Sequence, residues 1–129
     1  MLSLIKEIAN EKEFAIGNDV VHLPQFELSY QELFKRKVYT DKEMAYCEQF
    51  EPALLRYAST WAAKEAVYKA VKQLNPDPLA FKKIEILREK IGGKPIVNLP
   101  SNYDNLSVSL SLSHDGDYVW AVALVKENL

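Results

Sequence analysis

Four charged side chains in two separated stretches of this sequence have the types and spacing for chemistry on a phosphate. Asp19 lies in an apolar, strand-like run, and Lys64, Glu65 and Lys69 lie in the run Trp61–Lys69. Glu65 and Lys69 are four residues apart and share a helix face, whereas Lys64 projects about 100° away from Glu65. Two carboxylates from separate elements suit Mg²⁺, which prefers oxygen ligands and usually bridges to a substrate phosphate. Lysines beside such an ion would neutralise charge on a transferring phosphoryl group.

Each of these residues also has an ordinary structural explanation. Asp19 can be a turn former at a kink or an exposed strand residue instead of an inward ligand. The spacing of Glu65 and Lys69 is that of an intrahelical salt bridge, which contributes roughly 0.3 kcal/mol when exposed. A carboxylate on a buried helix nevertheless needs a partner, and for Glu65 that partner is Lys69 or a metal ion. Trp61 is expected in the core and not stacked on a cofactor.

Several other classes of site do not fit the sequence. One candidate histidine, His114, and no cysteine pattern cannot fill a tetrahedral zinc site. The sequence has no Gly-x-x-x-x-Gly-Lys phosphate loop and no serine nucleophile elbow. Cys47 is the single cysteine, so we expect a packed thiol in a reducing compartment, the cytoplasm. The net charge of −2 and the lack of a long apolar run give no reason to expect binding to nucleic acid or a membrane.

Hydrophobic periodicity outlines the elements that would position these residues. The 129 residues suit one domain with one core, preceded by an extension over 1–13 to which we assign no role. A strand is expected over 14–23, and Gly17-Asn18 within it suggests a bulge or the close approach of another group. Capping-box patterns at Ser29 and Thr40 each begin a helix. The expected helices cover 1–10, 29–38, 40–50 and 53–74, of which the last, with no Gly or Pro, is long and largely buried.

The last third of the chain changes to the periodicity of strands. Leu106–Ser113 alternates apolar residues with serine, which is typical of a half-buried strand, and Asp115-Gly116 centres a hairpin turn. A turn is expected at Gly92-Gly93. Helices followed by antiparallel strands predict an α+β fold, with a small antiparallel sheet packed on the long central helix. The expected strands of this part cover 81–87, 94–99, 106–113 and 118–125.

Three fragments together resemble the holo-acyl-carrier-protein synthase branch of the 4′-phosphopantetheinyl transferases. Gly17 and Asp19 match the first motif of that family, Gly-x-Asp after an apolar strand start. The run Trp61–Lys69 matches its most specific motif, Trp-x-x-Lys-Glu-Ala-x-x-Lys, and residues 108–115 resemble a later stretch. The resemblance extends over about residues 14–125 and implies a single domain with the fold of that family.

The resemblance implies a reaction and a role for each matching residue. An enzyme of this type moves 4′-phosphopantetheine from coenzyme A to a serine of an acyl carrier protein in lipid biosynthesis, and releases adenosine 3′,5′-bisphosphate. At the matching positions, Asp19 and Glu65 are implied to hold Mg²⁺ against the diphosphate. Lys69 is implied to contact the phosphates, and Lys64 to lie near the site. We therefore expect Asp19, Glu65 and Lys69 to be catalytic, and Lys64 and Lys69 to bind coenzyme A.

The resemblance also implies a homotrimer whose sites lie between subunits. Ser113, His114 and Asp115 of a neighbouring chain would then bind the nucleotide end of coenzyme A. The carrier serine needs a general base. Glu65 and a metal-bound water are candidates, and His114 is less suited because the family places it at the far end of the cofactor. Carrier proteins are acidic, so the basic run 35–37 can steer them, unless that run only complements its helix dipole.

Two residues depart from the family pattern. His22 stands where many relatives have glutamate, and Asn18 replaces an apolar residue next to Asp19. Either change can alter how Asp19 is held, although His22 also suits an ordinary surface position. These two residues are the support for an alternative, a non-catalytic module that keeps the trimer and the coenzyme A site. A third hypothesis is a plain structural α+β domain.

Overall fold

The computed structural model describes residues 13–89 and 93–128. The helix expected over 1–10 and Gly92 of the expected turn lie outside the described residues. In chain order the elements are β1 (Phe14–His22), α2 (Leu23–Ser29), α3 (Glu32–Val38), α4 (Asp41–Cys47), α5 (Leu54–Leu74), the 3₁₀ turn η1 (Phe81–Lys83), β2 (Glu85–Arg88), β3 (Pro95–Asn98), the 3₁₀ turn η2 (Ser101–Tyr103), β4 (Leu106–Asp115) and β5 (Tyr118–Glu127).

The main sheet has three antiparallel strands in the order β1-β5-β4. β1 pairs with β5 along its whole length, from Phe14 opposite Lys126 to His22 opposite Tyr118. β4 and β5 form a hairpin, and Gly116 in its turn has a φ of 57°, which favours glycine. β2 and β3 form a separate two-stranded sheet. The α+β prediction is confirmed, and the sheet combines the first strand with the last two.

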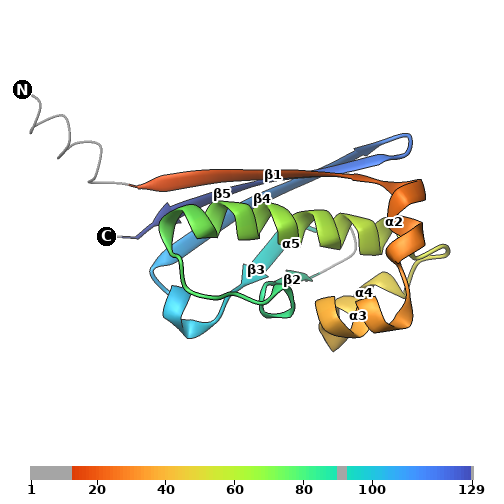
Figure 1. Ribbon diagram of the computed structural model, residues 1–129, viewed down its shortest axis with the longest axis horizontal. Helices are drawn as coiled ribbons and strands as arrows, with labels where there is room; N and C mark the ends of the chain where they lie inside the picture. Colours follow the sequence, from red (N-terminus) through yellow and green to blue (C-terminus); the bar gives the residue numbers. More distant parts are fainter. Residues whose placement is uncertain (1–12, 90–92, 129) are drawn as a thin grey trace, which may run out of the picture.

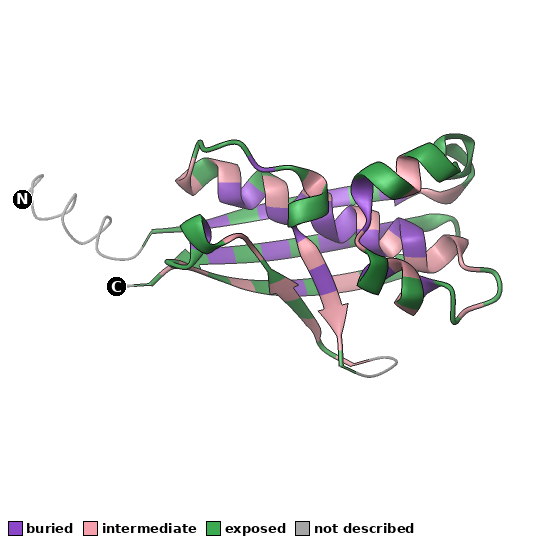
Figure 2. Ribbon diagram, turned by 90° about the horizontal axis from the view of Figure 1, so that it is seen from below, coloured by how far each residue is buried: buried purple, intermediate pink, exposed green. Residues whose placement is uncertain are grey.

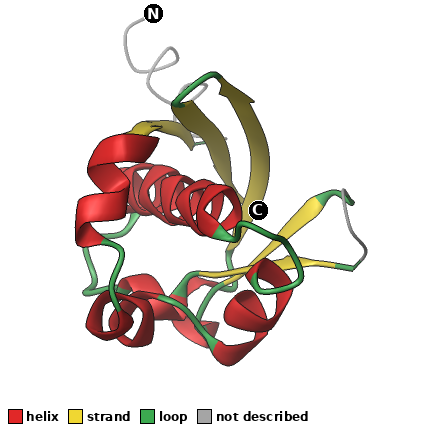
Figure 3. Ribbon diagram, turned by 90° about the vertical axis from the view of Figure 1, so that its right-hand side faces the viewer, coloured by secondary structure: helices red, strands yellow, loops and turns green. Residues whose placement is uncertain are grey.

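α5 lies across one face of this sheet, with α2, α3 and α4 gathered near one end of it (Figure 1). Figure 3 shows α5 nearly end-on between the sheet and the short helices. Side chains on the inner face of β1 and β5 alternate with exposed ones, so buried and exposed residues alternate along these two strands (Figure 2). The buried alanines of α5 let the strands approach closely. In the described ranges no helix has both the length and the apolarity needed to cross a membrane.

β1 and α5 approach each other closely at Gly17. A Cβ atom on this residue would lie 2.0 Å from the carbonyl oxygen of Ala66 and 2.8 Å from the nitrogen of Ala70. The pairing of β1 with β5 continues unbroken through Gly17 and Asn18, so the strand has no bulge there. Of the two explanations for this glycine, close approach of another group is the one that the structure shows.

The helices after β1 differ in part from those expected. Pro24 lies in the first turn of α2, where its missing N–H costs nothing, so a helix that was not among those expected begins here. α3 begins at Glu32 with Gln31 as N-cap and no side-chain cap, so the capping box expected at Ser29 does not form. At Thr40 the capping box does form. The Thr40 N–H donates to the Glu43 carboxylate at 2.8 Å, and the Glu43 N–H donates to the Thr40 hydroxyl at 3.3 Å.

The strand expected over 81–87 is shorter than predicted. It begins with η1, and only Glu85–Arg88 pair as a strand. The carbonyls of Phe81 and Ile84 turn inward and accept hydrogen bonds from the Lys64 ammonium, which takes them out of a strand ladder. The connection between β3 and β4 contains the second 3₁₀ turn, η2.

The outer face of the main sheet is apolar and exposed. Its aromatic and aliphatic side chains come from alternate positions of β1 and β5, and serines of β4 continue the same face. The exposed residues include Phe14, which is 63% exposed, Ile16, Val20, Trp120, Val122 and Leu124. Exposed apolar faces of this kind are typical of surfaces that proteins use for contacts with other molecules.

Candidate functional site

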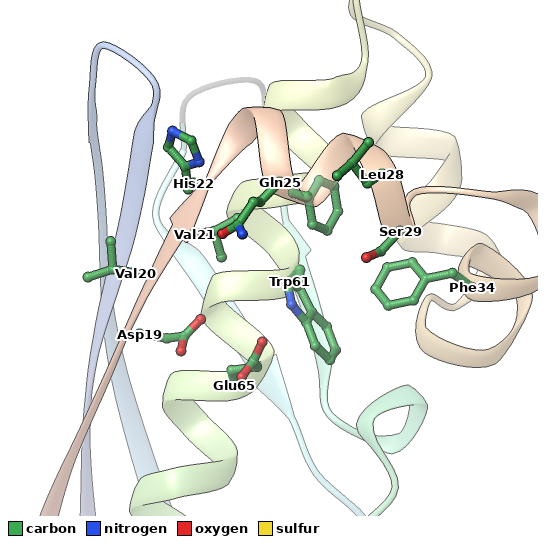
Figure 4. Close-up of a pocket in the computed structure, with 11 residues that line it drawn as sticks. Asp19, Val20, Val21, His22, Gln25, Leu28, Ser29, Phe34, Trp61 and Glu65 are labelled. Atoms are coloured by element: carbon green, nitrogen blue, oxygen red, sulfur yellow. The ribbon is translucent and has the colours of Figure 1, made fainter.

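A cavity of about 600 Å³ opens where β1, α2 and α3 meet α5 (Figure 4). Two acidic residues line it, Asp19 from β1 and Glu65 from α5, and their carboxylates extend toward the same space in Figure 4. The strand and the helix that carry these residues are packed backbone to backbone at Gly17. The two sequence fragments with candidate ligands therefore meet at one place in the fold.

Asp19 points inward because of strand alternation. Gly17, Asp19 and Val21 share the face of β1 that packs on α5, and Asp19 is 9% exposed. Its Oδ1 lies 2.9 Å from Nζ of Lys69, and the same ammonium donates to the carbonyl of Asn18 at 3.0 Å. Of the explanations for Asp19, inward orientation is the one observed, and its role as a metal ligand stays a prediction.

Glu65 is half-buried, and its environment disfavours the charged form. Burial raises its pKa, the nearby negative charge of Asp19 raises it further, and Lys69 opposes both effects. Among the described residues, the salt bridge of Lys69 is to Asp19 and not to Glu65. The intrahelical pair suggested by the spacing of Glu65 and Lys69 is thus replaced by a pair between helix and strand. Glu65 keeps a carboxylate directed at the cavity.

The donor set in this cavity fits Mg²⁺. Mg²⁺ takes oxygen ligands, and one or two carboxylates with waters and a substrate phosphate are enough to bind it. Across residues 13–89 and 93–128, no group of three or more His, Cys, Asp or Glu side chains is assembled for a metal. The described residues around this cavity therefore do not form a metal site from protein side chains alone. Asp19 and Glu65 are the residues that would hold the ion, with substrate oxygens completing its coordination.

Lys64 does not reach the cavity. Its side chain is fully buried on another side of α5, where Nζ lies 2.7 Å from Oε1 of Glu43. It also donates to the carbonyls of Phe81 and Ile84 at 3.0 and 2.5 Å. The expectation that Lys64 binds coenzyme A does not fit this position, because all three of its N–H groups are engaged in the core. The partner Glu43 was recognised in the sequence only as part of a capping box.

Ser113, His114 and Asp115 lie at the far end of β4, next to the hairpin turn, and all three are exposed. None of them lines the cavity with Asp19 and Glu65. Within one chain the structure does not bring these two groups of residues together. Their expected contact with a nucleotide therefore stays a prediction that requires a second chain.

Sequence reasoning missed part of the cavity wall because it missed α2, which contributes Gln25, Leu28 and Ser29. Proline at the start of a helix was the available signal. Trp61 was expected in the core, and it both packs there and lines the cavity. Its ring lies 5.2 Å from that of Phe34 in an edge-on arrangement.

His22 also lines the cavity. Its ring lies 5.0 Å from that of Tyr118, on the neighbouring strand β5. The residue that departs from the family pattern is therefore part of the wall, three positions along β1 from Asp19. It is only partly exposed, so it is not a simple surface residue.

Comparison with known proteins agrees with this geometry. The family model of the 4′-phosphopantetheinyl transferase superfamily matches residues 15–123. The holo-[acyl-carrier-protein] synthase of Ruminiclostridium cellulolyticum is 35% identical over 124 residues, which cover 88% of this chain and 92% of that protein. The protein of the same name from Chlorobaculum tepidum is 36% identical over 112 residues, with coverage of 84% and 95%.

Solved structures show the same fold. The complex of the Chronobacterium ammoniagenes synthase with coenzyme A has a TM-score of 0.76 at 28% identity, and covers 91% of this chain and 99% of that one. The Bacillus anthracis holo-(acyl-carrier-protein) synthase, in complex with CoA (3′,5′-ADP), has a TM-score of 0.72 at 26% identity, with coverage of 88% and 96%. From the family match, these relatives and the fold, the chain belongs to the 4′-phosphopantetheinyl transferase superfamily, in its holo-acyl-carrier-protein synthase branch.

Proposed function

We propose that this protein transfers 4′-phosphopantetheine from coenzyme A to a serine of an acyl carrier protein, with Mg²⁺, and releases adenosine 3′,5′-bisphosphate. The observation that carries the proposal is the convergence of Asp19 and Glu65 on one cavity, with the Lys69 ammonium 2.9 Å from Asp19. Carboxylates and a lysine together are what a diphosphate and its cation require. The names of the similar proteins, and the complexes with coenzyme A among them, support the same reaction.

Asp19, Glu65 and Lys69 have different roles in this reaction. Asp19 and Glu65 would hold the ion, which would neutralise charge on the diphosphate oxygens. Lys69 has a side chain that is 51% exposed, so it can reach from Asp19 to a phosphate oxygen and donate a hydrogen bond there.

The serine oxygen attacks the phosphorus that bears the pantetheine arm, and the bond from that phosphorus to the adenosine bisphosphate breaks. The serine proton passes to a general base. Glu65, which lines the cavity, and a water molecule held by the ion are the two candidates for this role, whereas His114 does not line the cavity.

The proposed working form is a homotrimer. Its support is the apolar outer face of the main sheet, where Phe14, Ile16, Val122 and Leu124 are all exposed in a single chain. Burial of such a face against copies of the same chain would remove it from water. The same association offers a way for the segment 113–115 of a neighbour to reach the nucleotide end of coenzyme A.

The carrier protein would approach a basic surface next to the cavity. Arg36 and Lys37 are exposed at the end of α3, and the Lys82 ammonium donates to the Arg36 carbonyl at 2.9 Å, which places η1 beside them. Lys35 is less available, because its ammonium lies 4.4 Å from the centre of the Tyr30 ring. A positive surface of this kind favours the association of an acidic partner.

The decisive experiment measures the mass of a carrier protein. The protein is incubated with coenzyme A, Mg²⁺ and an apo carrier of fatty acid synthesis, and the carrier should gain the mass of phosphopantetheine. Asp19→Ala and Glu65→Ala should each abolish this gain, whereas Glu51→Ala, at an exposed acidic residue, should not. No gain with any carrier, in Mg²⁺ or in Mn²⁺, would contradict the proposal. Tight binding of coenzyme A without transfer would instead favour a non-catalytic module.

A further inference from the structure

A buried ion pair, Glu43–Lys64, joins α4 to α5 away from the cavity. Neither side chain is accessible to solvent. Burial raises the pKa of Glu43 and lowers the pKa of Lys64, and the attraction between the two opposes both shifts. The Glu43 carboxylate also accepts the N–H groups of Thr40 and Ile86, each at 2.8 Å. Well-packed apolar residues often replace such a pair without loss of stability, so its presence calls for a role other than stability alone.

Lys64 fixes the segment that carries Phe81. Its ammonium donates to the carbonyls of Phe81 and Ile84 at 3.0 and 2.5 Å. The Phe81 ring in turn lies 4.9 Å from the ring of Trp61, at an angle of 62°. Trp61 lines the cavity beside Glu65, as Figure 4 shows. The contacts therefore run without interruption from the ion pair, through one aromatic ring, to the wall of the cavity.

We propose that Lys64 is a positioning residue for the transfer reaction. Paired with Glu43, it holds Phe81 against Trp61, and the Trp61 ring then forms a fixed wall beside Glu65. This inference rests on the proposed function, and it replaces direct contact between Lys64 and coenzyme A. A displacement of about 1 Å at a reacting centre can lower a rate by about 100-fold, so the position of this wall matters to the reaction.

The first test is Lys64→Met, which removes the charge and keeps an unbranched side chain. We expect kcat/KM for carrier modification to fall by about 10- to 100-fold. We also expect the fluorescence of Trp61, measured in a Trp120→Phe background, to shift to longer wavelength as its ring loses a packed neighbour. Val125→Ala is the matched control. It opens a cavity in the buried face of β5, opposite Ala15 at the start of β1, and should leave both readouts unchanged.

The second test asks whether Lys64 acts through Phe81. Phe81→Leu keeps the ion pair and removes the contact with the Trp61 ring, so it should reproduce the spectral shift. If both residues act through one wall, their losses in kcat/KM are not additive, and the double variant is no slower than the slower single variant. Additive losses would overturn the proposal. So would an unchanged Trp61 spectrum in folded Lys64→Met.

If Lys64→Met does not fold, a third variant tests the same proposal. Glu43→Gln keeps the shape of the side chain and an oxygen that can accept the Ile86 N–H. We expect the same fall in kcat/KM and the same shift of the Trp61 fluorescence as in Lys64→Met. An unchanged Trp61 spectrum in this variant would overturn the proposal equally. A wild-type protein that modifies no carrier would contradict the proposed function. The spectra would still report whether Lys64 holds the wall.

Discussion

The Lys69 ammonium and the Asp19 carboxylate lie 2.9 Å apart and join the central helix to the first strand. The same ammonium is 3.0 Å from the Asn18 carbonyl, so it sits over the strand and not over its helix neighbour Glu65. With half of the lysine side chain exposed, such a pair adds little to stability. Its importance lies in the position of a solvent-exposed positive charge near the carboxylates of Asp19 and Glu65.

Replacement of this lysine tests its role directly. In Lys69→Met we expect kcat/KM for carrier modification to fall by at least about 100-fold, because a charged donor to the diphosphate is lost. Lys72→Met is the matched control, about one turn along the same helix, where the ammonium donates to the carbonyls of Pro76 and Asp77. Steady-state kinetics on the two variants give the comparison. Equal losses in both would remove Lys69 from the reaction.

The outer face of the sheet predicts the state of association. Leu124→Glu places a charge in the middle of that face, where the side chain is 43% exposed in a single chain. We expect light scattering after size exclusion to show trimers for the wild type and monomers for this variant, since burial of an unpaired charge is costly. Ile96→Glu, at a residue of similar exposure on β3, should leave the trimer intact. A monomeric wild type would refute the proposed assembly.

Gly17 predicts a large effect from a single methyl group. In Gly17→Ala the new Cβ would overlap the Ala66 carbonyl, which is main chain and cannot rotate away. We expect the free energy of unfolding in urea to fall by about 3 kcal/mol. Gly116→Ala is the comparison, because its Cβ meets no atom within 4 Å and only the positive φ is strained, at about 1 kcal/mol. Similar losses in the two variants would argue against the close approach of β1 to α5.

Cys47 predicts the response to thiol reagents. Burial raises the pKa of its thiol to about 12, while a contact with the Thr60 hydroxyl opposes this change. At pH 8 only about one thiol in ten thousand would be ionised, so modification of the folded protein should be very slow. The rate should rise as the pH approaches the pKa, and rapid reaction should follow unfolding in urea. Fast reaction of the native protein at pH 8 would show that Cys47 is not buried.

Elements with a strong periodic pattern were predicted well. The run without Gly or Pro predicted both ends of α5 to within one residue. The alternation of Leu106–Ser113 predicted most of β4. Local capping signals were less reliable. Thr40 forms its capping box, whereas the same pattern at Ser29 does not, because α2 already includes Ser29. A short motif specifies a helix start only where the neighbouring chain leaves that position open.

Within the site, the sequence predicted which residues line the cavity better than it predicted which residues they contact. Asp19 and Glu65 do line one cavity, as their motifs suggested. Helical spacing placed Lys69 on the face of Glu65 and Lys64 about 100° away from it, but it could not identify the partner of either lysine. Their partners, Glu43 on α4 and Asp19 on β1, are 21 and 50 residues distant in the sequence. Such long-range pairs depend on how the elements pack, which periodicity does not report.

The pairing of β1 with β5 has a consequence for synthesis on the ribosome. Phe14 pairs with Lys126, and β1 as a whole pairs with β5. The strand that carries Asp19 therefore lacks these backbone hydrogen bonds until β5 has left the exit tunnel. The helical middle of the chain can form earlier, because its contacts are local. A nascent chain would thus carry Glu65 and Lys69 long before it can hold a carboxylate opposite them. The complete site therefore forms in one late step, when β5 pairs with β1.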